Sequence, residues 1–119
     1  MMQRRSFLIA ALTGLGAWSG AARAHHGWSH YDASRPLTLT GKIVEAAYDY
    51  PHATIKLQTP DRLWLCVLAP PYRMDTRGLP RDSLKVGETA TVMGYPERDG
   101  ADEMRAERIT LAGRTVELR

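Results

Sequence analysis

From Leu37 onward, apolar side chains recur at every second position, in short runs separated by turn residues. In the first run, one face holds Leu37, Leu39, Gly41 and Ile43 and the other holds Thr38, Thr40, Lys42 and Val44. A period of two is typical of a strand with one buried face, whereas an amphipathic helix repeats every 3.6 residues. Similar runs follow at 55–58, 63–68, 89–94, 104–111 and 115–118. The chain is therefore predicted to be all-β.

Turn residues set the connections between these runs. Thr59-Pro60-Asp61-Arg62 predicts a tight turn between the second and third strands, and Pro70-Pro71 ends the third. Alternation is absent between Tyr72 and Val86, where we expect a helical turn over Asp82–Lys85. The first five runs, with a short helical insert between strands 3 and 4, predict a small five-stranded OB-like Greek-key barrel over residues 37–119, and the last run is a short terminal strand. An SH3-like barrel is the nearest alternative.

The strand phases also predict the core. Its expected members are Leu39, Ile43, Ile55, Leu57, Leu65, Val67, Val92 and Ile109. Cys66, the only cysteine, stands in an apolar run, so we expect a buried thiol and no intramolecular disulfide.

Residues 1–24 are predicted to be a cleaved signal peptide of the twin-arginine type. Arg4-Arg5 precedes an apolar run that contains two glycines and is too short to be a good permanent membrane anchor. Ala22-Arg23-Ala24 offers the small-x-small pattern that signal peptidase needs. We therefore expect the twin-arginine export machinery and signal peptidase as partners, and a periplasmic protein without a stable membrane anchor. Residues 25–36 are then an N-terminal arm.

Charge argues against nucleic acid as a partner. The predicted signal holds three of the 16 basic residues and none of the 13 acidic ones, so the remaining chain is neutral if its histidines are neutral. A nucleic-acid-binding domain of this size is normally basic.

Histidines are the leading candidates for a functional site. Cleavage after Ala24 would make His25 the first residue, so its α-amine and imidazole could hold one ion together, with His26 adjacent. His52 follows Pro51 in the loop after the first strand, which in an OB barrel lines the usual ligand site together with the loop between strands 4 and 5. Nitrogen ligands of this kind favour Cu(II) among divalent first-row metals. We predict a copper site at His25, His26 and His52; a solvated arm, with His52 capping a strand end, is the alternative.

Aromatic residues suggest a second kind of site. Tyr48, Tyr50 and Trp64 could form a stacking platform for a ligand, although packing in a small barrel would also explain them. No catalytic template matches: the chain lacks a nucleophile elbow, a phosphate-binding glycine loop and a paired-cysteine zinc motif.

Several segments together resemble a family of small exported bacterial proteins known as a domain of unknown function. The matching segments are His25-His26-Gly27-Trp28, Leu37-Thr38-Leu39-Thr40-Gly41-Lys42-Ile43, Pro51-His52 and Leu84-Lys85-Val86-Gly87-Glu88. Members typically begin the mature chain with Ala-His-His-Ser-Phe and contain Asn-Pro-His; here Gly27-Trp28 replaces Ser-Phe, and Tyr50 replaces the asparagine. The resemblance implies a periplasmic barrel, places His25, His26 and His52 on the family's recurring histidines and brings no activity.

The sequence thus predicts a periplasmic binding module with copper as the leading ligand. A metal-free module that binds a ligand or protein at the barrel mouth is the alternative, and a histidine-brace copper redox enzyme is a third.

Overall fold

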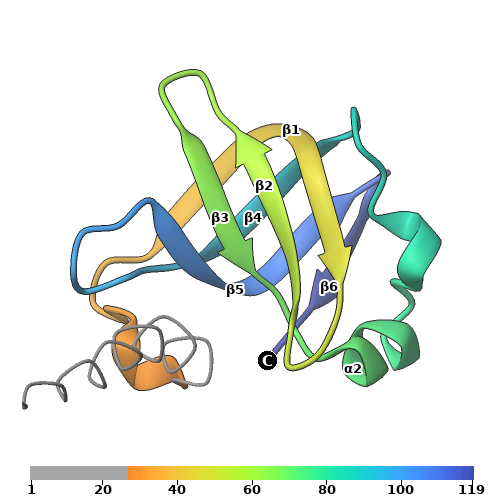
Figure 1. The fold of residues 1–119 in the computed structure, drawn as a ribbon, viewed down its shortest axis with the longest axis horizontal. Helices are drawn as coiled ribbons and strands as arrows, with labels where there is room; N and C mark the ends of the chain where they lie inside the picture. The colour runs from red at the N-terminus through yellow and green to blue at the C-terminus, as the bar shows by residue number, and fades with distance from the viewer. Residues whose placement is uncertain (1–26) are drawn as a thin grey trace, which may run out of the picture.

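β1 (Leu37–Tyr48) is the longest strand, and the rest of the barrel is arranged around it (Figure 1). The computed structural model describes residues 27–119. The first half of β1 pairs antiparallel with β4 (Thr89–Pro96), and its second half pairs antiparallel with β2 (Ala53–Gln58). A register shift between Ile43 and Glu45 marks a bulge near this change of partner, so a single strand serves two parts of the sheet.

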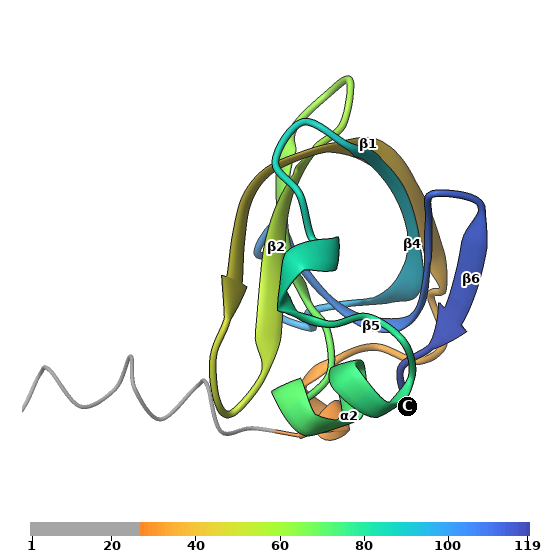
Figure 2. The same cartoon turned by 90° about the vertical axis from the view of Figure 1, so that its right-hand side faces the viewer.

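The remaining strands close the sheet on itself. β2 pairs with β3 (Leu63–Val67), β4 pairs with β5 (Glu103–Leu111), and β5 continues through a tight turn into β6 (Arg114–Glu117). A parallel pairing of β3 with β5 closes the sheet, so the pairings run around the barrel in the order β1-β2-β3-β5-β4. Figure 2 shows the strands curving around a ring. The predicted five-stranded OB-like barrel is confirmed, with β6 as an added edge strand.

A helical insert between β3 and β4 covers one end of the barrel. It consists of α2 (Pro71–Thr76) and the 3₁₀ turn η3 (Arg81–Ser83), so the predicted short helical insert is confirmed. The turn expected over Asp82–Lys85 begins one residue earlier and is shorter, and α2 was not expected. Pro71 ends the preceding extended segment and also begins α2, because the missing N–H of proline costs nothing in the first turn of a helix. Met74, Leu79 and Leu84 are buried and extend the barrel core at this end.

Alternation within the strands builds the core as predicted, except in β3. Five predicted core residues are fully buried, namely Ile43, Ile55, Leu57, Val92 and Ile109, and Leu39 packs against them. In β3, Cys66 is buried and Trp64 packs on the core, whereas Leu65 and Val67 are half-buried. The expected phase of this strand is therefore wrong, because a run that is apolar at every position does not indicate which face is inward.

No helix among residues 27–119 is both long enough and apolar enough to cross a membrane.

Candidate functional site

The N-terminal arm lies against the β4–β5 side of the barrel, anchored by Tyr31. Tyr31 is buried, forms a backbone bridge with Glu97, and donates its hydroxyl to Oε2 of Glu103 at 2.6 Å. Burial, with the nearby Glu103 carboxylate, raises the pKa of Tyr31 well above its usual value. The Arg98 side chain and backbone N–H donate to the carbonyls of Ser29 and His30. Backbone and side-chain contacts therefore fix the arm at this point.

Trp28, in the 3₁₀ turn η2 (Trp28–His30), docks on two arginines. The guanidinium of Arg105 lies 4.4 Å from the centroid of the indole, and that of Arg119 lies 4.3 Å from it. Tyr95 meets the same ring edge-on, at a centroid distance of 6.1 Å. Guanidinium groups over an indole face make favourable cation–π contacts, so Trp28 is a second anchor of the arm.

Arg105 also reaches His52, in the loop between β1 and β2. Its Nη2 lies 3.2 Å from Nε2 of His52. A guanidinium can only donate, so Nε2 accepts and the neutral ring carries its proton on Nδ1. Arg105 is only 6% exposed, and this burial lowers the pKa of its guanidinium. One buried side chain thus links the predicted site residue His52 to the arm residue Trp28.

His25 and His26 lie outside the described residues, three and two positions before Trp28. Within residues 27–119, no group of three or more His, Cys, Asp or Glu side chains is arranged to hold a metal ion. Cys66 is buried as expected, and desolvation raises the pKa of its thiol to about 12.

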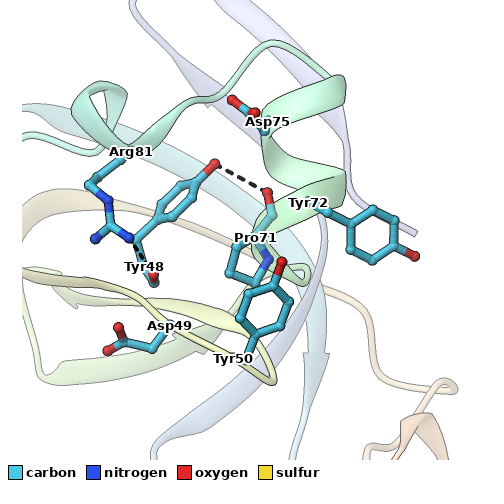
Figure 3. A pocket seen from close by; sticks show the side chains of 7 residues that line it. All are labelled: Tyr48, Asp49, Tyr50, Pro71, Tyr72, Asp75 and Arg81. Atoms are coloured by element: carbon cyan, nitrogen blue, oxygen red, sulfur yellow. Dashed lines mark hydrogen bonds between the residues drawn. The ribbon is translucent and has the colours of Figure 1, made fainter.

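The aromatic residues singled out in the sequence fall in two places. Tyr48 and Tyr50 line a pocket of about 580 Å³ formed by the end of β1, the β1–β2 loop, α2 and η3 (Figure 3). Trp64 is not among the lining residues; it packs on the core, and the Arg62 guanidinium lies 5.8 Å from its ring centroid. Of the two loops expected to form a ligand site, the β1–β2 loop contributes to this pocket, while the residues between β4 and β5 contribute none of its lining.

Five lining residues were not expected from the sequence: Asp49, Pro71, Tyr72, Asp75 and Arg81. Tyr48 connects the two sides of the pocket: its hydroxyl donates to the carbonyl of Leu79 at 2.7 Å and so links β1 to the helical insert. Burial raises the pKa of Tyr48. The sequence offers one indication of these residues: the Pro70-Pro71 pair, directly before Tyr72, shows that the third strand ends there and that a different element follows.

Comparisons with known proteins place the chain in a family and a fold. The model of a family of unknown function, DUF6152, matches residues 14–105. No curated protein matches the chain. Similar solved structures include a complex of TiaS with an isoleucine tRNA and ATP, with a TM-score of 0.51, 23% identity and coverage of 75% of this chain. They also include a ZRD-deleted mutant of TiaS in complex with agmatine, with a TM-score of 0.52, 22% identity and coverage of 74%. The aligned region spans only 20% and 25% of those chains, so the likeness concerns the fold alone.

Proposed function

This chain belongs to the family of unknown function DUF6152, and we propose that it is an exported, periplasmic binding module that holds Cu(II) on its mature N-terminal arm. In this proposal the twin-arginine signal ends at Ala24. The α-amine and imidazole of His25 then form the chelate, and His26 and His52 supply further imidazoles.

The observation that carries the proposal is the chain of contacts from Trp28 through Arg105 to His52. Trp28 is held 4.4 Å from the Arg105 guanidinium, and that guanidinium lies 3.2 Å from the imidazole of His52. Residues 25 and 26 are three and two positions before this anchor, so the chain allows them at most about 11 Å and 7 Å from it, because one residue spans at most about 3.6 Å. The docked arm therefore supports a site in which residues distant in sequence meet at the barrel wall.

Arg105 sets a condition on this site. Its bond to Nε2 occupies that nitrogen, so ligation through Nε2 requires the guanidinium to turn away, and ligation through Nδ1 requires the ring to change tautomer. The positive charges of Arg105 and Arg119 oppose a cation, whereas the carboxylates of Glu103 and Glu107 lie beside the same arm contacts and offset them.

Titration calorimetry of the mature protein with Cu(II) tests the proposal. Intact-mass analysis first checks that the exported chain begins at His25. One alanine added before His25 keeps every side chain and removes the terminal chelate, so it should weaken binding about as much as loss of an imidazole. His52→Ala should weaken binding too, whereas His30→Ala is the matched control and should have little effect.

Proton competition gives an independent check. The α-amine has a reference pKa of about 7.7–8.0 and imidazole one of about 6.5, so Cu(II) affinity should fall steeply as the pH drops below about 6.5. Cu(II) should also bind more tightly than Zn(II). Equal Cu(II) binding by the native and the alanine-extended proteins would rule out the amine chelate.

A further inference from the structure

The pocket between the β1–β2 loop and the helical insert carries two carboxylates without partners (Figure 3). Asp49 and Asp75 are exposed, and neither makes a hydrogen bond or ion pair through its side chain with any residue from 27 to 119. In Figure 3 they lie apart, Asp49 at the β1–β2 loop and Asp75 on α2. The pocket thus offers two separated, unpaired negative charges.

Among the described residues, the one cation that lines the pocket is already engaged. The guanidinium of Arg81 lies 5.1 Å from the ring centroid of Tyr48, and its Nη2 donates to the Tyr48 carbonyl at 3.2 Å. With one arginine against two aspartates, the lining has a net negative charge. This balance disfavours an anionic ligand and favours a cationic one.

Tyr50 supplies the open aromatic surface. Tyr48 has Arg81 over its ring, and Tyr72 has Arg73 at 5.9 Å, whereas Tyr50 has no cation over its ring within residues 27–119 and is 69% exposed. Figure 3 shows its ring beside Pro71, whereas the Asp49 side chain extends to the other side of the loop. An open aromatic face in a pocket of net negative charge binds an alkylammonium group by cation–π attraction, and the charge of the pocket adds to that attraction.

We propose that this pocket binds aliphatic diamines and polyamines. One ammonium group lies over the Tyr50 ring, a second is directed toward Asp75, and the hydrocarbon chain between them runs along Pro71. Asp49 adds to the negative charge of the pocket without contacting the ligand. This site uses none of the residues of the proposed copper site.

Metal-free mature protein titrated with 1,5-diaminopentane, pentylamine and the neutral 1-pentanol tests this proposal. An exposed ion pair contributes up to about a fivefold change in affinity, so the diamine should bind about fivefold more tightly than pentylamine, and pentanol should not bind measurably. Chemical-shift changes in the amides of residues 48–50 and 72–75 should locate the ligand. Equal binding of the diamine and the monoamine, or binding of 1-pentanol as tight as that of the diamine, would overturn the proposal.

Variants sharpen the test. Asp75→Asn should weaken diamine binding about three- to fivefold and remove most of its advantage over pentylamine. Asp49→Asn should have a smaller effect of the same sign, because this carboxylate acts only through the charge of the pocket. Arg81→Gln removes the repelling charge and should strengthen binding by a similar factor. Asp82→Asn is the matched control, because Asp82 is exposed, is next to Arg81 in η3 and does not line the pocket. This variant should bind the diamine with the same affinity as the native protein. If Asp49→Asn and Asp75→Asn bind the diamine as the native protein does, the site is not the one proposed. His52→Ala should bind diamines normally, which separates this proposal from the copper site.

Discussion

Cys66 shows how far the environment of one residue follows from its neighbours in sequence. It stands between Leu65 and Val67 in an apolar run, which predicts a thiol that acts as a small hydrophobic group. The structure confirms this, because Cys66 is fully buried in the barrel core. Desolvation of the thiolate raises the pKa of Cys66 to about 12, so the thiol is neutral in the folded protein at physiological pH.

This raised pKa predicts a loss of stability in mild alkali. The pKa of Cys66 is about 8.5 in the unfolded chain and about 12 in the folded one. The stability that comes from burying the neutral thiol is therefore complete below about pH 8.5 and is lost as the pH rises toward 12. Between pH 8 and pH 10 the free energy of unfolding should fall by about 1–2 kcal/mol from this thiol. Urea denaturation at each pH measures the fall. Cys66→Ala cannot titrate there and should show a clearly smaller slope; equal slopes would contradict the prediction.

The partner of His52 could not be predicted in the same way. Sequence position alone puts His52 in the loop after the first strand, and the structure agrees. Its contact with Arg105 spans 53 residues and depends on the parallel β3–β5 pairing, which places Arg105 beside Val67. Nothing near either residue in the sequence encodes this pairing. The expectation that Tyr48 and Tyr50 share a surface needed only their local spacing.

Elements were predictable where the apolar pattern is one-sided and unpredictable where it is not. β2 alternates strictly, and its Ile55 and Leu57 are buried as expected. β3 is apolar at every position, so the pattern does not indicate which of its two faces points into the barrel. α2 was missed because six residues are too few to display a helical period.

Close approach of two strands explains a glycine in β4 and leads to a prediction at this scale. A Cβ on Gly94 would overlap the backbone carbonyl oxygen of Arg105 on β5, at the point where the register of the two strands shifts. Gly94→Ala should therefore force the strands apart and lower the free energy of unfolding by about 1–3 kcal/mol, the usual cost of overpacking. Thermal or urea denaturation measures this loss. The control is Gly27→Ala, where a Cβ has no atom within 4 Å and the change should stay within about 0.5 kcal/mol. A native-like Gly94→Ala would show that the strands can separate at no cost.

For the molecule as a whole, the order of strands and the helical insert were enough to predict an OB-like barrel, but not how the barrel holds its arm. Barrel closure follows from strand count and spacing, because an open edge of a small sheet needs a partner. Arm docking depends on aromatic and charged side chains from β4, β5 and the C-terminal residue Arg119, which meet only after the barrel has closed. Trp28 and Tyr31 are aromatic residues of the arm, but nothing near them in the sequence indicates their partners.

The two anchors should contribute differently, and Trp28→Ala separates arm docking from barrel folding. Trp28 lies outside the core cluster, so its removal should leave the β-sheet circular dichroism unchanged and cost about 1–2 kcal/mol through loss of its two guanidinium contacts. The Tyr31 amide, which donates to the Trp28 carbonyl, should exchange with deuterium much faster than in the native protein. Trp64→Ala is the contrast: this ring packs on the core, so its loss should cost about 3 kcal/mol and speed exchange throughout the barrel. Unchanged exchange at Tyr31 in Trp28→Ala would mean that Tyr31 and the Arg98 hydrogen bonds hold the arm without Trp28. The structural support for bringing His25 and His26 to His52 would then be lost.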